Sequence, residues 1–203
     1  MEIRKTALEP GKFYHIFNRG INKSQVFFEE KNYPFFLEKY AKYVFPWVKT
    51  YAYCLLGNHY HLLVQVREVS EMTLPKNTHK SYEWHVSNAF SSFLQSYTRS
   101  INKVYGRSGA LFETPFKRIE VTNDSYYSRL VSYIHQNPQK HGIIEDFKDY
   151  PHSSYWSHLS TTKNSKLERN DVLDWFGGEN AYQDFHMNGV SKIEKELTLE
   201  DIN

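Results

Sequence analysis

The sequence contains a single cysteine, Cys54, among its 203 residues. One cysteine excludes an internal disulfide and a cysteine-based zinc site, and this usage fits a reducing cytoplasm. The sequence also lacks any apolar run near the roughly 20 residues that cross a bilayer. Its first twelve residues, MEIRKTALEPGK, contain no apolar signal region. We therefore expect a cytoplasmic protein that makes no contact with membranes.

A strong net charge is absent as well, since 25 Lys and Arg against 23 Asp and Glu leave +2. The charges are unevenly divided, however. Residues 1–143 hold 19 basic and 11 acidic side chains, whereas residues 144–203 hold 6 and 12. This asymmetry favours a body that binds a polyanion and carries an acidic C-terminal segment. The alternative is solvated surface charge that clusters by chance.

Apolar content is sufficient for a packed core, because 40% of residues are hydrophobic and 17% are aromatic. The length allows one large domain or a domain with an appended piece. We expect a main domain over residues 1–156 and an acidic, helical C-terminal extension over residues 157–203. This extension could dock as one or two small helices, and either cover the basic face or mediate assembly.

Hydrophobic periodicity predicts the order of elements in the main domain. Strands are expected over residues 13–19, 47–56, 59–66 and 110–121, and helices over 32–45, 82–104 and from 123 or 124 towards 137. A tight turn at Gly57-Asn58 predicts that the second and third strands form a hairpin at the centre of the sheet. Pro115 argues for an edge position or a bulge in the fourth strand. The order predicts a ferredoxin-like or RRM-like α+β fold, an antiparallel sheet with helices packed on it.

The third strand carries two histidines with alternate spacing, His59 and His61. Side chains alternate between the faces of a strand, so both imidazoles share one face, while Tyr60, Leu62 and Val64 form an apolar stripe on the other. Two neighbouring imidazoles can bind one metal ion. Two ordinary polar residues on a sheet face are the alternative.

The last helix carries Tyr133 and Asn137, four residues apart and therefore on one helical face. Pro138 disfavours helical geometry at the preceding residue, which predicts that Asn137 lies at the helix end. The pair could be a nucleophile beside a third metal ligand, or a half-buried aromatic beside a C-capping amide. His135 should point away from Tyr133, so a surface or packing role is favoured for it. His15 could lie beside the central strand and support the metal ligands, but a structural role is favoured.

Together these stretches resemble one family, the Y1 (HUH) transposases of the IS200/IS605 type, and are most similar to its REP-associated tyrosine transposases. His59-Tyr60-His61 resembles the His-hydrophobic-His motif, and Tyr133 with Asn137 resembles the tyrosine-x-x-x-amide helix motif. Supporting segments are YHIFNRG at 14–20, GALFETPFK at 109–117, YIHQNPQKHG at 133–142 and YPHSSY at 150–155. The resemblance covers roughly residues 11–156. Tyr60 departs from the usual aliphatic residue, and Asn137 replaces the glutamine common in insertion sequences.

The resemblance implies a transposase that nicks and rejoins single-stranded DNA at hairpins through a 5′-phosphotyrosine intermediate. Tyr133 would be the nucleophile, and His59, His61 and Asn137 would hold a divalent metal, Mg or Mn. Zinc or nickel would also suit a two-histidine site on ligand chemistry alone. Related enzymes include dimers and monomers, so the resemblance leaves open a homodimer and whether Tyr133 acts on its own histidines. The resemblance also implies nucleoid association during DNA binding.

Basic residues interleaved with aromatics predict the DNA contacts, because cations follow a phosphate backbone and aromatic rings stack on unpaired bases. Two alternatives predict different behaviour. A non-catalytic RRM-like nucleic-acid-binding protein would bind in EDTA without a covalent adduct, and a small-molecule metallohydrolase would tolerate Tyr133→Phe. The expected DNA-binding residues are Arg19, Lys23, Arg99, Lys103, Arg107, Lys117 and Arg118.

Overall fold

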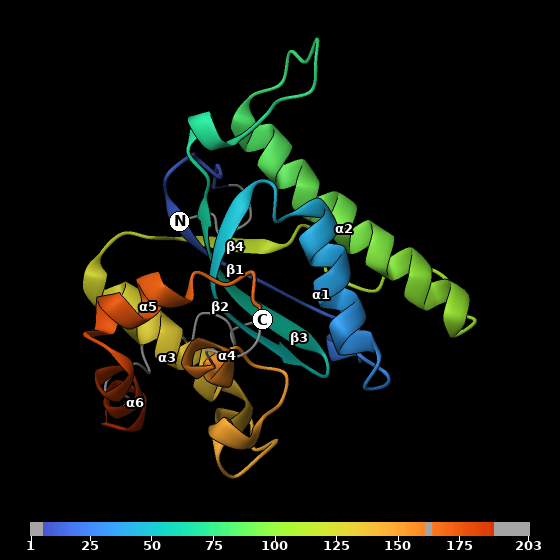
Figure 1. Cartoon of the computed structure of the whole chain (residues 1–203). Helices are drawn as coiled ribbons and strands as arrows, with labels where there is room; N and C mark the ends of the chain where they lie inside the picture. The colour runs from blue at the N-terminus through green and yellow to red at the C-terminus, as the bar shows by residue number, and fades with distance from the viewer. Residues whose placement is uncertain (1–5, 161–163, 189–203) are drawn as a thin grey trace.

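The computed structural model describes residues 6–160 and 164–188 (Figure 1). The main domain follows the expected order of strand, helix, strand, strand, helix, strand, helix, and the α+β fold class is confirmed. Its elements are β1 (Phe13–Arg19), α1 (Asn32–Tyr43), β2 (Val48–Leu56), β3 (His59–Val66), α2 (Tyr82–Val104), β4 (Lys117–Val121) and α3 (Asp124–Lys140). Three short helices follow: α4 (Tyr155–Leu159), α5 (Arg169–Phe176) and α6 (Glu179–Asn188).

The four strands form one antiparallel sheet in the order β2-β3-β1-β4. β2 and β3 form the expected hairpin, but its predicted place at the centre of the sheet is wrong. β1 pairs with β3 along its whole length, which leaves β2 at an edge. Later parts of the chain cover that edge, because the Leu55 amide donates to the His152 carbonyl (3.0 Å) and the Glu168 amide to the Thr50 carbonyl (2.9 Å).

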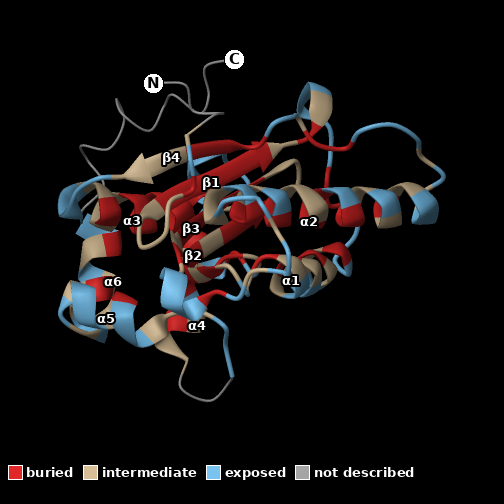
Figure 2. Ribbon diagram, turned by 90° about the horizontal axis from the view of Figure 1, so that it is seen from above, coloured by how far each residue is buried: buried red, intermediate tan, exposed pale blue. Residues whose placement is uncertain are grey.

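Helices α1 and α2 cover one face of the sheet, and α3 with α4–α6 covers the other (Figures 1 and 2). The apolar stripe of β3 faces α1 and α2, where Tyr60, Leu62 and Val64 are at most 1% exposed. The histidine-bearing face of β3 contributes Leu63 to the second core. Alternation along β3 therefore places the two imidazoles on the side of the sheet that α3 covers.

The C-terminal helices pack into this second core. Val172 of α5 and Tyr182 of α6 are fully buried there, together with Leu130 and Ile134 of α3. The extension contains the helices α5 and α6, as expected, while its residues 161–163 and 189–203 lie outside the described residues. The domain boundary near residue 156 stays a prediction.

Four element boundaries differ from the sequence expectations, of which the start of β2, at Val48, differs by a single residue. α1 ends at Tyr43, and β4 begins only at Lys117, after Pro115. α3 continues through Pro138 to Lys140, so the predicted helix end at Asn137 is wrong. A proline removes one helical donor, but the His141 amide still donates to the Asn137 carbonyl (3.0 Å), which closes a further turn.

The described helices include none with the length and apolar character to cross a membrane.

Candidate active site

A pocket of about 490 Å³ opens where β1 ends, β3 and β4 begin, and the C-terminal half of α3 crosses the sheet. Strand register brings these ends together, because Arg19 pairs with His59, and Phe17 pairs with both His61 and Lys117. The lining residues are Phe17, Asn18, Arg19, Lys23, Asn58, His59, His61, Lys117, Tyr133, His141 and Ile143.

His59 and His61 lie on the same face of β3 with their ring centroids 5.2 Å apart. Each Nδ1 has a polar neighbour. The Nδ1 of His59 lies 2.6 Å from Oδ1 of Asn58, and the Nδ1 of His61 lies 3.1 Å from Nε2 of His15. Burial holds the pKa of His61 well below its usual value, and the nearby His59 and His15 lower it further. A neutral imidazole is the form that binds a metal ion.

Tyr133 projects from α3 into the same pocket and is 7% exposed. Its ring meets His61 edge-to-face at a centroid distance of 5.8 Å, and meets His15 at 6.3 Å. The ammonium of Lys140, two turns along α3, lies 4.7 Å from the centroid of the tyrosine ring. A phenol and two imidazoles of one chain therefore share one cavity.

Asn137 lies one turn beyond Tyr133 on α3 and is fully buried, so it does not line the pocket. Among the described residues, neither its amide nitrogen nor its amide oxygen has a hydrogen-bond partner. A buried polar group left in this way costs about 1–3 kcal/mol. Binding of the amide oxygen to a metal ion would relieve part of that cost.

No group of three or more His, Cys, Asp or Glu side chains in the described part of the chain could hold a metal ion. A metal bound to His59 and His61 would therefore need a different kind of third protein ligand. Asn137 offers an amide oxygen, a ligand type that suits magnesium and manganese. These residues fit a divalent ion by their chemistry.

Three of the seven predicted DNA-binding cations line the pocket: Arg19, Lys23 and Lys117. Arg19 forms an ion pair with Glu113 (2.6 Å). Lys117 is 5% exposed, and its ammonium lies 5.7 Å from the Phe17 ring centroid. Positive charge is thus gathered beside the tyrosine, where a phosphate could bind.

The other four predicted cations lie elsewhere. Arg118 follows Lys117 on β4 and points to the opposite face, where it donates to Oγ of Ser87 on α2 (2.6 Å). Arg99 and Lys103 are exposed on α2, and Arg107 follows that helix. The structure therefore does not bring all seven together in the pocket.

Sequence reasoning gave no site role to three neighbours of these residues, Asn58, Lys140 and His141, and it favoured a structural role for a fourth, His15, over one beside the metal ligands. The ring of His141 meets that of His59 at 5.0 Å. Its position, eight residues after Tyr133, places it on the helical stripe of Tyr133 and Asn137, and this spacing is a signal that the sequence contained. The contacts of His15 depend on the pairing of β1 with β3.

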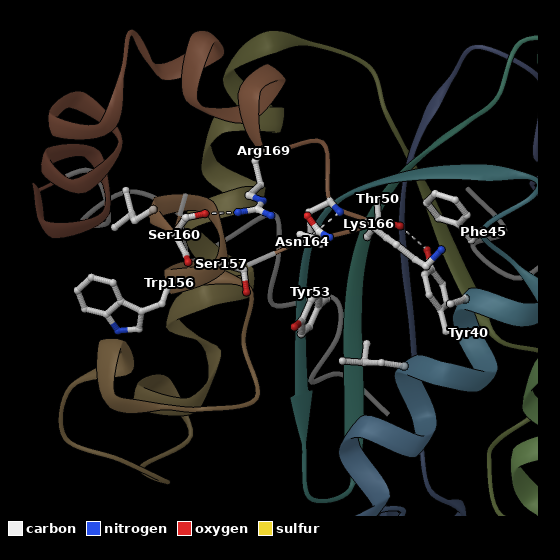
Figure 3. Close-up of a pocket in the computed structure, with 15 residues that line it drawn as sticks. Tyr40, Phe45, Thr50, Tyr53, Trp156, Ser157, Ser160, Asn164, Lys166 and Arg169 are labelled. Carbon is white, nitrogen blue, oxygen red and sulfur yellow. Dashed lines mark hydrogen bonds between the residues drawn. The ribbon is translucent and has the colours of Figure 1, made fainter. Parts of the chain in front are cut away.

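A larger pocket of about 620 Å³ lies between α1, β2 and residues 156–160 and 164–169 (Figure 3). It is lined mainly by apolar and hydroxyl side chains, with Tyr40 hydrogen-bonded to Thr50 (2.7 Å) and the Lys166 ammonium 4.4 Å from the Phe45 ring centroid. It contains none of the predicted catalytic or metal-binding residues. We therefore place the candidate active site in the smaller pocket.

A four-stranded antiparallel sheet with two histidines on an inner strand and a tyrosine on a covering helix is the arrangement expected for a tyrosine transposase of the HUH class. No family model matches the chain. A curated Haemophilus influenzae protein assigned as a REP-associated tyrosine transposase is 30% identical over 110 residues, which cover 53% of this chain and 58% of that protein. The chain thus matches a little over half the length of this relative.

A solved structure of a REP-associated tyrosine transposase bound to a REP hairpin matches with a TM-score of 0.56 and 20% identity, covering 88% of this chain and 97% of that one. The sequence match confirms the resemblance to REP-associated tyrosine transposases that the motifs predicted. The structural match confirms the fold.

Proposed function

We propose that this protein is a tyrosine transposase that nicks and rejoins single-stranded DNA at hairpins. The observation that carries the proposal is the pocket that Tyr133, His59 and His61 of one chain line together with three cations, and in which the ring of Tyr133 meets that of His61. The curated relative supports the same class of activity. We propose that Tyr133 acts with the histidines of its own chain, with which it shares the pocket.

In the proposed reaction the phenolic oxygen of Tyr133 attacks the phosphorus of a DNA phosphodiester. The bond to the 3′-oxygen breaks, the 5′-phosphate becomes attached to the tyrosine, and the proton of the phenol is balanced by the proton gained at the new 3′-hydroxyl. One phosphate ester replaces another. A DNA 3′-hydroxyl can therefore reverse the step and rejoin a strand without ATP.

His59, His61 and Asn137 would hold a divalent ion, magnesium or manganese. Such an ion supplies Lewis-acid stabilisation of the charge that develops on the phosphate. The buried amide of Asn137, without a hydrogen-bond partner in the described structure, supports this assignment. Arg19, Lys23 and Lys117 would neutralise the DNA backbone on either side of the reacting phosphate.

Hairpin DNA is the substrate that we propose, in the cytoplasm and in association with the nucleoid. The solved structural neighbour is bound to a REP hairpin, and the basic lining of the pocket suits a polyanion. The single cysteine, Cys54, is buried and fits a reducing compartment.

The test is incubation of end-labelled hairpin DNA carrying single-stranded flanks with the protein and manganese, followed by a denaturing gel. We expect a protein–DNA adduct that is lost with EDTA and in Tyr133→Phe. Tyr126→Phe is the matched control, because Tyr126 lies on the same helix outside the pocket. Binding that persists in EDTA, with no adduct from the wild type on any hairpin, would instead indicate a non-catalytic nucleic-acid-binding protein.

A further inference from the structure

We infer that His15 is a positioning residue that holds His61 in the tautomer able to bind a metal ion. The inference rests on the proposed function of the pocket. It concerns a residue that does not line the pocket and does not reach the DNA: His15 is fully buried in the middle of β1.

The pairing of β1 with β3 determines this contact. His15 pairs directly with Leu63, and Phe17 pairs with His61. His15 and His61 are therefore diagonal neighbours on one face of an antiparallel pair, within reach of each other. Their rings stack at 5.3 Å with an interplanar angle of 28°, and Nε2 of His15 lies 3.1 Å from Nδ1 of His61.

A hydrogen bond between two neutral imidazoles can be made in two ways, and only one leaves His61 able to bind a metal. If Nε2 of His15 donates, Nδ1 of His61 accepts, and the single proton of His61 must lie on its own Nε2, which blocks that nitrogen. If Nδ1 of His61 donates, Nε2 of His61 carries a lone pair. His15 then holds its own proton on Nδ1 and accepts through Nε2.

The hydrogen bond of His59, the other candidate metal ligand, indicates which of the two arrangements applies to His61. Nδ1 of His59 lies 2.6 Å from the amide oxygen of Asn58, which can only accept, so His59 carries its proton on Nδ1 and presents Nε2. A shared metal that is bound through Nε2 of His59 requires the matching form of His61. Asn58 and His15 thus perform the same task for the two histidines, one as an amide and one as an imidazole.

An imidazole suits the buried position better than the carboxylate that often performs this task. Around His15 the pocket floor consists of the rings of Phe17, His61 and Tyr133. A neutral acceptor there needs no compensating charge. Partners of this kind orient a ligating histidine and raise its basicity, and their loss typically weakens metal affinity 10–100-fold.

The test measures Mn²⁺ binding to the full chain without DNA, by calorimetry, for the wild type, His15→Phe and His15→Gln. We expect the dissociation constant to rise 10–100-fold in His15→Phe, which keeps a ring but lacks an acceptor. We expect a smaller rise in His15→Gln, whose amide oxygen can accept from His61. His85→Phe is the control, because His85 is a buried histidine that contacts Thr78 outside the pocket, and its Mn²⁺ affinity should equal that of the wild type.

Adduct formation on hairpin DNA separates positioning from general damage. At saturating Mn²⁺, His15→Phe should approach the wild-type rate, with only the metal concentration for half-maximal rate increased. A lower rate at every metal concentration with unchanged Mn²⁺ affinity would overturn the inference. If His15→Phe does not fold, His15→Gln decides by the same criteria.

Nitrogen-15 NMR of the metal-free wild type provides a second test. It reads the tautomer of His61 directly and needs no variant. We expect His61 to carry its proton on Nδ1, and a proton on Nε2 would overturn the inference. Unchanged Mn²⁺ affinity in both variants, with the wild type still forming adduct, would overturn the role of His15 and leave the proposed function intact. A wild type that neither binds Mn²⁺ nor forms adduct would contradict the proposed function itself.

Discussion

Two groups of histidines flank α3, and their surroundings differ. The site group consists of His15, His59 and His61 on the sheet face that α3 covers. His59 and His61 line the pocket, and His15 lies against His61. The packing group consists of His135 on α3, His158 and His186. In it, Nδ1 of His135 lies 2.9 Å from Nε2 of His186, and Nε2 lies 2.7 Å from Oγ of Ser154.

Burial alone does not distinguish the two groups. It holds the pKa of both His61 and His135 well below the usual value, and the neighbouring imidazoles lower both further. The difference is access and charge. The site group opens onto a cavity lined by three cations and Tyr133, whereas aromatic rings of Tyr155 and Tyr182 enclose the packing group. A perturbed histidine is thus a functional candidate only where a ligand can reach it.

Alanine substitution of one histidine in each group should give the largest difference between the two groups. We expect His61→Ala to reduce metal-dependent adduct formation more than 100-fold, since it removes a proposed metal ligand. His135→Ala should leave the adduct rate per folded molecule within about twofold and lower the melting temperature instead. Gel quantification of adduct, normalised to the folded fraction by circular dichroism, checks both. Equal loss of adduct in the two variants would show that the distinction between the groups is wrong.

We expect the contacts of the packing group to contribute strongly to the free energy of unfolding. Tyr182 is fully buried, and its ring centroid lies 4.2 Å from that of His186 and 5.4 Å from that of Tyr155. We expect Tyr182→Ala to lower the free energy of unfolding by about 3–5 kcal/mol, the usual cost of removing a large buried ring. Urea denaturation measures it. Phe185→Ala, at a half-buried position of the same helix, should cost clearly less.

The packing group also predicts a pH dependence of stability. Burial lowers the pKa of His158 to about 3 and of His186 to about 4, whereas an unfolded histidine titrates near about 6.5. The unfolded state therefore binds more protons below pH 6.5, so stability is complete above that pH and is lost as the pH falls towards 4. At pH 5 the loss is about 2 kcal/mol for each histidine.

Urea denaturation at pH 7 and pH 5 measures that loss. His186→Gln should reduce the difference between the two pH values, because an amide does not titrate. His141→Gln, at an exposed position, is the control and should keep the wild-type difference. An unchanged difference in His186→Gln would contradict the assignment.

The local elements were largely predictable from the sequence. β1 has the expected bounds, the stripe of β3 is buried as its alternation predicted, and the Asn123 side chain caps α3 by accepting from the Tyr126 amide (2.8 Å). These features depend on neighbours within a few residues. The edge position of β2 depends on the pairing of β1 with β3, and the edge is covered by His152 and Glu168, which are distant in the sequence. The local preference against helix at Pro138 was likewise overridden, because residues 130–138 of α3 are all buried.

The residues of the site likewise divide into those that local sequence predicts and those that depend on contacts distant in the sequence. His59, His61 and Tyr133 were predicted because their spacing matches the motifs of the resembling family, and the structure places them in one pocket. The hydrogen bond of His15 requires the register of two strands, because His15 and His61 lie 46 residues apart in the sequence. Asn137 was named from its spacing, but its complete burial could not be inferred, since it depends on how α3 rests on the sheet.

The smallest expected effect concerns the two faces of β4, and it tests which of its cations contact DNA. Lys117 and Arg118 are adjacent, and alternation sends the first into the pocket and the second to Ser87 of α2. Each phosphate contact contributes about one counterion to the salt dependence of DNA binding. We expect Lys117→Gln to lower the slope of log affinity against log salt by about 1, measured by fluorescence anisotropy of labelled hairpin DNA in EDTA. Arg118→Gln should leave the slope unchanged, because its guanidinium already bonds within the protein on the opposite face. An equal change in both would mean that DNA contacts the α2 side of the sheet, and the pocket would then be too narrow a definition of the binding surface.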